Sequence, residues 1–343
     1  HLRPRRQRQM CIRDRDMIAE EEMVLTITHN GYIKRTSLST YRSQRRGGRG
    51  VQGASSREED FVEHLFVANT HSYILFFTDK GKCYWVKVYD IPEGGRAAKG
   101  RAIVNLIGCE PDEKVSAFIS VKEFNEDHYV VMATEKGMVK KTKLSAYSNP
   151  RKKGIYAVEI RDGDKLIEAR VSTGDNDILL GTRNGKSIRF SEEQIRASGR
   201  KTMGVKGITL SSEDDRLVGM LLIKREGTVL VATEKGFGKR TEISQYRAQK
   251  RGGKGVLTMK TTDKVGKMVT IKEVVDKDDL MIITNQGVLI RLPVAQIRSI
   301  GRATQGVKLI KLGEGTLVSS ITRIMSEEEE DENNNTESTE TKE

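Results

Sequence analysis

The chain has 343 residues, of which 36% are hydrophobic and 31% are charged, and its formal net charge is +12 at pH 7. No apolar run approaches the roughly 20 residues of a membrane-spanning helix, and the arginine-rich start lacks the apolar segment of a signal peptide. The three cysteines, Cys11, Cys83 and Cys109, form no CxxC pair, which argues against a cysteine zinc site and fits a reducing compartment. We therefore expect a cytoplasmic protein.

The positive charge is concentrated in the body of the chain. Residues 1–15 contribute +5 and residues 327–343 contribute −8, which leaves +15 for residues 16–326. A folded body this basic indicates a polyanionic partner, although a basic but inert protein is the alternative. We interpret residues 1–15 as a linker or a non-native segment and residues 326–343 as a disordered acidic tail.

Six similar repeats follow one another between residues 16 and 325. In each repeat an apolar strand runs into a turn that ends in glycine, and a second strand carries basic residues. The turn glycines are Gly31, Gly81, Gly137, Gly185, Gly236 and Gly287, spaced by 50, 56, 48, 51 and 51 residues. Each repeat therefore predicts a β-hairpin whose glycine adopts a positive φ.

A basic loop follows each hairpin and ends in a second glycine, at positions 50, 100, 154, 207, 255 and 306. Apolar segments after these glycines, such as IVNLIG after Gly100 and VKLIKL after Gly306, are expected to form further strands. Single helical turns are expected at EEQIRA (192–197) and VAQIRS (294–299). Six such units predict an all-β, propeller-like ring, with a linear β-solenoid as the alternative.

The loop of the first repeat, QRRGGRG (Gln44–Gly50), gives the clearest indication of function. Its glycines allow close approach to a phosphate and leave N–H groups free, and its arginines offer planar donors to phosphate oxygens. The fifth repeat contains a similar loop, QKRGGKG (Gln249–Gly255). The predicted DNA-binding residues are Gln44, Arg45, Arg46, Gly47, Gly48, Arg49, Gly50, Lys34, Arg35, Arg96, Lys99, Arg101, Arg151, Lys152, Lys153, Arg200, Lys201, Lys206, Lys239, Arg240, Lys250, Arg251, Gly252, Gly253, Lys254, Gly255, Arg302 and Lys308.

Motifs of catalysis or metal binding are not found in this sequence. GTRNGKS (181–187) resembles a P-loop but has three residues, not four, between its glycines, and it lies at a hairpin turn. The five histidines are scattered, and no nucleophile is paired with a base. We therefore expect no catalytic residue, no metal and no cofactor in this chain.

The heptapeptide Gln44–Gly50 resembles the gyrase A box, the signature of the C-terminal domain of DNA gyrase A. It departs from that box only at Arg49, where lysine is commoner. The surrounding run, Met23–Gly53, resembles the first blade of that domain, and the similarity extends over about residues 16–325. The loop at Gln249–Gly255 and the acidic tail resemble the enzymes of low-GC Gram-positive bacteria.

The resemblance implies a six-bladed β-pinwheel that binds, bends and positively wraps duplex DNA without sequence preference, so that gyrase introduces negative supercoils. It also implies a domain that is monomeric when isolated and that works at the nucleoid with the rest of gyrase A and with gyrase B in an A2B2 enzyme. The catalytic tyrosine and the ATPase would belong to those other parts. The C-terminal domain of topoisomerase IV is the alternative, followed by a protein-interaction propeller, and the intact box and the absence of WD signatures argue against them.

Overall fold

The computed structural model describes residues 18–28, 30–37, 62–95, 98–110, 112–149, 151, 153–224, 227–286 and 289–324. The chain forms two compact parts, residues 1–125 with 145–157 and residues 126–144 with 158–343. Four features for which the sequence makes predictions lie outside the described residues. They are the linker (1–15), the acidic tail (326–343), the turn glycine Gly287 and the first basic loop, Gln44–Gly50.

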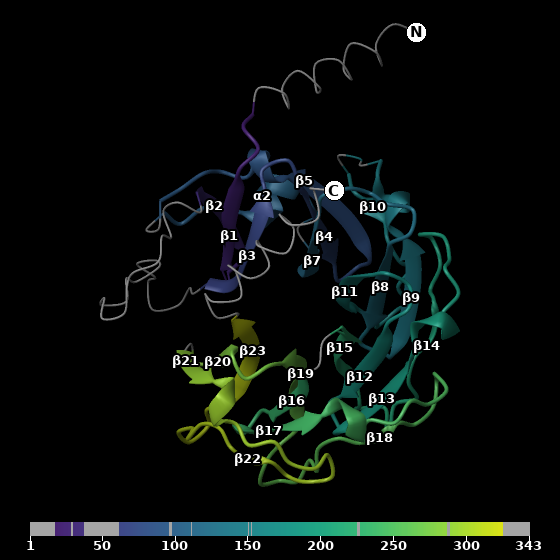
Figure 1. Ribbon diagram of the computed structural model, residues 1–343, viewed down its shortest axis with the longest axis vertical. Coiled ribbons are helices and arrows are strands. Elements are labelled where there is room, and N and C mark those ends of the chain that lie inside the picture. Colours follow the sequence, from purple (N-terminus) through teal and green to yellow (C-terminus); the bar gives the residue numbers. More distant parts are fainter. Residues whose placement is uncertain are drawn as a thin grey trace, which may run out of the picture. The chain divides into compact units, whose positions relative to one another are not determined.

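Two antiparallel sheets make up the described portion of the first part, with strand orders β3-β1-β2-β6 and β10-β5-β4-β7 (Figure 1). Their strands are β1 (Glu22–Thr28), β2 (Tyr32–Ser37), β3 (Val62–Asn69), β4 (Tyr73–Thr78), β5 (Lys82–Lys87), β6 (Arg101–Ala102), β7 (Val115–Val121) and β10 (Ile155–Tyr156).

The second part contains four sheets among its described residues, with orders β11-β8-β9-β14, β15-β12-β13-β18, β19-β16-β17-β22 and β21-β20-β23. Their strands are β8 (Tyr129–Thr134), β9 (Met138–Lys143), β11 (Leu166–Ser172), β12 (Asp177–Thr182), β13 (Lys186–Ser191), β14 (Val205–Lys206), β15 (Leu217–Ile223), β16 (Thr228–Thr233), β17 (Phe237–Glu242), β18 (Val256–Leu257), β19 (Met268–Val274), β20 (Asp279–Thr284), β21 (Leu289–Pro293), β22 (Val307–Lys308) and β23 (Val318–Ile324).

The hairpins form where the repeats predict them. Gly31 has a φ of 75°, and its N–H donates to the carbonyl of Thr28, which closes the turn between β1 and β2. The hydroxyl of Thr28 accepts from the N–H of Tyr32, so the threonine also holds the strand that leaves the turn. The turns at Gly81, Gly137 and Gly185 repeat this pattern with Thr78, Thr134 and Thr182.

Short helices lie mainly after the second strands. They are η2 (Val88–Asp90), α2 (Ile103–Ile107), η3 (Leu144–Tyr147), η4 (Glu192–Gln194), η5 (Ile243–Gln245) and η6 (Val294–Gln296). The turns predicted at 192–197 and 294–299 are therefore confirmed. The strand predicted for IVNLIG is wrong, because this segment forms α2, whose Ile103 and Ile107 are buried one turn apart and whose end at Gly108 has a φ of 62°.

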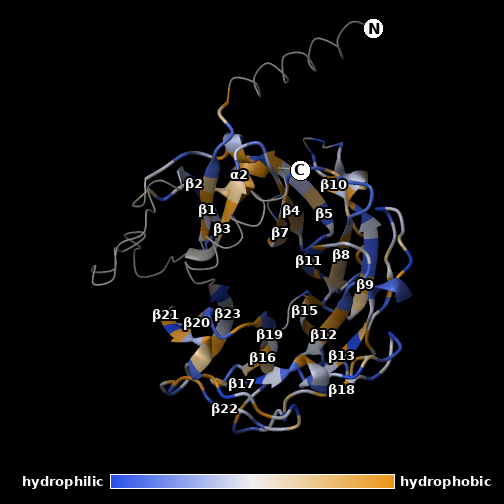
Figure 2. Cartoon of the chain, viewed as in Figure 1, coloured by the Kyte–Doolittle hydropathy of each residue, from blue (hydrophilic) through white to orange (hydrophobic). Residues whose placement is uncertain are grey.

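The apolar residues of the two parts gather on the strands (Figure 2). In β12, Ile178 and Leu180 pack with Val131 and Val139 of the third sheet, whereas Leu179 belongs to a second cluster. That strand is therefore buried on both faces, which explains its continuous apolar run in place of alternation. No helix in the described ranges is long and apolar enough to cross a membrane.

The edge strand of each four-stranded sheet comes from the following repeat. The loop of the second repeat leads into β6, which pairs with β2 of the first repeat through Ile33 and Arg101. The strands β10, β14, β18 and β22 pair in the same way with β5, β9, β13 and β17. Each basic loop in these repeats is thereby fastened to the sheet of its predecessor.

The glycine that ends each of these loops is required by a close contact with that sheet. A Cβ on Gly255 would lie 2.4 Å from the carbonyl oxygen of Ser187, and the φ of Gly255 is +69°. In the fourth repeat this role belongs to Gly204, not to the predicted Gly207. Gly204 has a φ of +81°, and a Cβ there would lie 2.4 Å from the carbonyl oxygen of Val139.

Replacing Gly255 with alanine should therefore lower the free energy of unfolding by about 2 kcal/mol, because both its φ and the space around it exclude a Cβ. Gly199→Ala is the matched control, since a Cβ at Gly199 meets nothing within 4 Å. Urea denaturation followed by circular dichroism measures both variants. Equal midpoints for the two would contradict the proposed strain.

Candidate nucleic-acid interface

The basic loops, which are fastened to the sheets by the short strands, carry exposed lysine and arginine side chains. Of the predicted residues, the exposed ones are Lys99, Arg101, Arg151, Lys153, Lys201, Lys206, Lys250, Lys254 and Lys308. The ammonium group of Lys99 lies 4.1 Å from the centre of the Tyr32 ring, so this aromatic side chain supports it. Arg96, Lys152 and Gln44–Gly50 lie outside the described residues.

In the fifth and sixth repeats, the arginine four positions before the final glycine of the loop makes hydrogen bonds to main-chain carbonyls of the protein. Arg251 donates from its Nε to the carbonyl of Gln194 and from Nη1 to that of Lys206, at 3.0 and 2.9 Å. Arg302 donates similarly from Nη1 to the carbonyl of Leu257 at 2.8 Å. Arg200 occupies the equivalent position in the fourth repeat and is likewise half-buried. Arg251 and Arg302 fasten one loop to the strand that follows the preceding loop, and they keep other N–H groups for a ligand.

The main-chain groups of the glycines in the fifth loop also make hydrogen bonds within the protein. The N–H of Gly252 donates to the carbonyl of Gly207 at 2.7 Å, and the carbonyl of Gly253 accepts from the N–H of Thr209 at 2.9 Å. The expectation that this loop leaves its N–H groups free for phosphate therefore fails for Gly252. Gly253 and Gly255 are half-buried beside the sheet, where they permit close packing of the backbone.

The second-strand lysines were predicted to face DNA, but the structure places them in the interior. Lys34 and Lys239 are 4% and 0% exposed. The Nζ of Lys34 donates to the carbonyls of Gly95 and Ala98, and that of Lys239 to carbonyls of residues 301–304. These ammonium groups point into the protein, because main-chain oxygens of the next loop are their hydrogen-bond acceptors.

Burial also changes how these lysines bind protons. It lowers the pKa of Lys239 to about 8, with a smaller contribution from Arg302. Lys140, the equivalent residue of the third repeat, is 1% exposed, and burial lowers its pKa to about 7. The physical cause is the loss of hydration of the ammonium form.

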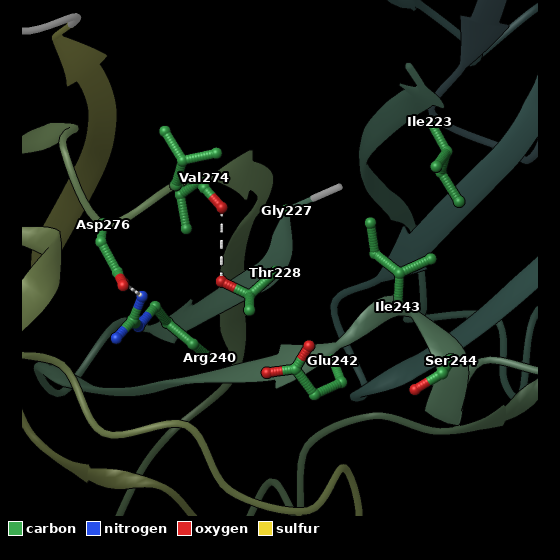
Figure 3. Close-up of a pocket in the computed structure, with 10 residues that line it drawn as sticks. Ile223, Gly227, Thr228, Arg240, Glu242, Ile243, Ser244, Val274 and Asp276 are labelled. Atoms are coloured by element: carbon green, nitrogen blue, oxygen red, sulfur yellow. Dashed lines mark hydrogen bonds and ion pairs between the residues drawn. The ribbon is translucent and has the colours of Figure 1, made fainter. Parts of the chain in front are cut away.

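The second-strand arginines are likewise engaged with the protein. Arg35 donates from Nε to the carbonyl of Ile91 at 2.8 Å and pairs with Glu93 at 3.3 Å. Arg240 is 9% exposed, donates from Nε to the carbonyl of Ile297 at 2.7 Å, and pairs with Asp276. Figure 3 shows its guanidinium in direct contact with Asp276, and both residues line a pocket of about 640 Å³. Arg35 and Arg240 therefore stabilise the region around the short helices, and their charges are balanced by acids.

Three exposed arginines were missed by the sequence analysis. Arg196, Arg247 and Arg298 each lie two residues after the glutamine that ends η4, η5 or η6. None of the three makes a side-chain hydrogen bond or ion pair with the part of the chain that the structure describes. The recurring Gln-Xaa-Arg pattern is present in EEQIRA and VAQIRS and would have identified two of them.

The glutamine of this pattern positions the following loop. The Oε1 atom of Gln194 accepts from the N–H of Arg251 at 2.9 Å, and that of Gln245 accepts from the N–H of Arg302 at 3.3 Å. The exposed arginines and the basic loops are thus held by the same short helices. Across the described ranges, no group of three or more His, Cys, Asp or Glu residues is arranged to hold a metal ion.

Comparison with known proteins places this arrangement in a family. The family model for the "DNA gyrase C-terminal domain, beta-propeller" matches six segments, residues 22–69, 72–122, 128–173, 176–224, 227–274 and 278–324. The DNA gyrase A protein of Staphylococcus epidermidis is 47% identical over 320 residues, and that of Staphylococcus aureus is 46% identical over 333 residues. The chain spans 36% and 37% of the length of these relatives, whereas the matches cover 92% and 96% of the chain itself.

Two solved structures are similar over most of the chain. The C-terminal domain of DNA topoisomerase IV has a TM-score of 0.80 and 26% identity, and the match covers 94% of this chain and all of that one. The C-terminal domain of DNA gyrase A has a TM-score of 0.70 and 24% identity, covering 89% of this chain and all of that one, which supports the fold alone.

The family model describes a beta-propeller, and its six matched segments correspond to the six small antiparallel sheets, so the chain has the six-bladed β-propeller fold that the repeats predicted. The sequence resemblance is therefore confirmed. The chain belongs to the family of DNA gyrase C-terminal domains.

The buried lysines predict how stability depends on pH. The folded chain releases the proton of Lys239 near pH 8, whereas the unfolded chain keeps it until about 10.5, so the free energy of unfolding should rise with pH between these values. The contribution of this lysine over that range is on the order of 3 kcal/mol. Denaturation of Lys239→Met at pH 7 to 10 should show a flatter rise than wild type, and the exposed Lys254→Met should not. Parallel curves for Lys239→Met and wild type would contradict this.

Proposed function

We propose that this chain binds the phosphate backbone of duplex DNA without sequence preference, bends it and wraps it with positive handedness. The observation that carries the proposal is the recurrence of exposed lysine or arginine side chains in, or directly after, the basic loops of repeats two to six. Phosphate contacts of this kind position DNA but carry no base information, which fits an interface built from lysine and arginine.

The exposed Gln-Xaa-Arg arginines extend the proposed interface. Arg196, Arg247 and Arg298 carry positive charge that no acid in the described residues neutralises, whereas Arg240 is paired with Asp276. Guanidinium groups suit phosphate oxygens because they offer several donors in one plane. We therefore add these three residues to the interface and remove Lys34, Arg35, Lys239 and Arg240 from direct contact with DNA.

The wrapping would serve a gyrase that introduces negative supercoils. The similarity to staphylococcal gyrase A proteins, of which this chain spans little more than a third, supports this role. In this proposal the chain acts at the nucleoid with the remainder of gyrase A and with gyrase B, as an A2B2 enzyme. The chain alone would not cut DNA, because strand cleavage and ATP hydrolysis would lie in those other parts.

A topoisomerase IV type of domain is the second candidate. It is favoured by the TM-score of 0.80 with a topoisomerase IV C-terminal domain. The identities of 46–47% with gyrase A proteins and the intact Gln44–Gly50 box favour gyrase. Fold similarity does not separate the two candidates, since related functions share the scaffold.

The salt dependence of binding tests the proposed interface. Replacing Arg196, Arg247 and Arg298 together with glutamine should reduce the slope of log Kd against log salt by up to about 2.7, because each phosphate contact contributes about 0.9. The charge-matched control replaces Lys165, Lys264 and Lys277, which are exposed lysines outside the basic loops. Fluorescence anisotropy with a duplex of about 40 base pairs at several salt concentrations measures the slope. Equal slopes for the two triple variants would remove these arginines from the interface.

Plasmid relaxation tests wrapping and its handedness. Relaxing plasmid with a type I topoisomerase in the presence of this chain should leave positive superhelical turns, and absence of wrapping would favour a domain of the topoisomerase IV type.

Replacing Arg45, Arg46 and Arg49 together with alanine should reduce wrapping more than initial binding, because bending costs several kcal/mol that the first loop would offset. Undiminished wrapping in this variant would show that the first loop is not the anchor.

A further inference from the structure

Three buried lysines recur at one position in alternate repeats. Lys34, Lys140 and Lys239 each stand three residues after the turn glycine of repeats one, three and five, and we call them the clamp lysines. The second, fourth and sixth repeats have Tyr84, Ile188 and Ile290 at this position. The loops of the second, fourth and sixth repeats therefore lie against a buried lysine, whereas those of the third and fifth repeats lie against an uncharged side chain.

Each clamp lysine binds the loop of the next repeat. The Nζ of Lys239 shares its three donors among four oxygens, the carbonyls of Gly301, Arg302 and Thr304 and the hydroxyl of Thr304, three of these contacts measuring 2.8 to 3.3 Å. The Nζ of Lys140 donates to the carbonyl of Arg200. That of Lys34 donates to the carbonyls of Gly95 and Ala98 at 3.0 and 2.9 Å.

The loops over the clamp lysines contain proposed DNA-binding residues. Lys99 and Arg101 flank the glycine that follows the acceptors of Lys34, and Lys308 lies two residues beyond Gly306 of the loop held by Lys239. The backbone approaches closely here, since a Cβ on Gly306 would lie 2.6 Å from the carbonyl oxygen of Gly238. The lysine and the strand pairing together hold each loop against the preceding sheet.

A carbonyl oxygen next to a phosphate is repulsive, because both are hydrogen-bond acceptors with negative partial charge. A loop that binds an anion must therefore turn its carbonyls away from the ligand and give them another donor. An ammonium group supplies three donors without an acceptor of its own, and its charge lies under the loop, where water screens it poorly. Leucine or methionine could fill this space but would supply no donor to the carbonyls of Ala98 and Arg302, which accept from the lysines.

We propose that the clamp lysines are positioning residues of the DNA interface. Each draws the main-chain carbonyls of the next repeat's loop inward, so that the loop presents its exposed bases to phosphate. This inference rests on the proposed function for its effect on DNA, but the ordering of the loop is a property of the protein alone. Lys239 is the clearest case because it has four acceptor oxygens.

Lys239→Met tests the proposal in the full chain, because methionine keeps much of the volume and removes the donors. Hydrogen exchange followed by mass spectrometry should show roughly tenfold faster exchange in residues 299–306, whose ordering depends on the clamp. Exchange in residues 248–255 should stay unchanged, because that loop lies beside Ile188. The matched control is Lys308→Met, which removes an exposed lysine. This variant should bind DNA more weakly, with a smaller dependence of the affinity on salt, but its hydrogen exchange should equal that of wild type.

DNA binding supplies the second measurement. Lys239→Met should bind a duplex several-fold more weakly than wild type at equal salt, and the same loss should follow Lys140→Met, which serves if Lys239→Met does not fold. Unchanged exchange in the clamped loop of a folded variant would overturn the proposal. If the wild-type chain failed to bind DNA, the proposed function would fail, while the exchange measurement would still decide whether the lysines order their loops.

Discussion

The arrangement of the basic surface depends on the pairing of a two-residue strand with the sheet of the preceding repeat. Strands β6, β10, β14, β18 and β22 each make this pairing. Because the strand follows the basic loop directly, the pairing fixes where the end of the loop meets the sheet. The glycine between them lies so close to a neighbouring carbonyl that no other residue fits, as Gly100, Gly204, Gly255 and Gly306 illustrate. Backbone geometry therefore sets the point at which each of these loops joins the preceding sheet.

Positive charge in this protein has two distinct uses. The exposed bases of the loops lie where an anion can reach them, whereas Lys34, Lys239 and Arg240 bind main-chain carbonyls inside. Burying an ammonium group is unfavourable unless its donors are satisfied, and a loop that crosses from another repeat supplies carbonyl acceptors, such as those of Ala98 and Arg302. The interior charges and the crossing loops therefore require each other. A basic pI alone does not distinguish these two uses, since both raise it equally.

The repeat, the hairpins and the turn glycines could be predicted from the sequence because those features are local: a glycine after Thr-Xaa-Xaa marks a tight turn wherever it occurs. The pairing between repeats could not, since a short strand such as Val205–Lys206 carries no pattern that identifies its partner. For the same reason the sequence favours Gly207 over Gly204, because the positive φ of Gly204 and its contact with the carbonyl of Val139 are known only from the fold. Lys34 and Lys99 also look alike in sequence, although one is buried and the other exposed. The missed arginines do have a local signal in Gln-Xaa-Arg, but that signal also marks a helical turn.

The comparison with solved domains shows what the scaffold leaves open. A topoisomerase IV domain and a gyrase A domain have TM-scores of 0.80 and 0.70 with this chain, although the identities are only 26% and 24%. The shared sheets therefore tolerate wide sequence change, because a buried strand requires mainly apolar residues of suitable volume. Sequence can then vary most where the scaffold imposes least, in the number and placement of bases on the loops. In this chain the interior lysines restrict that freedom in alternate repeats, since a loop that gives its carbonyls to a buried ammonium can vary its side chains but not its path.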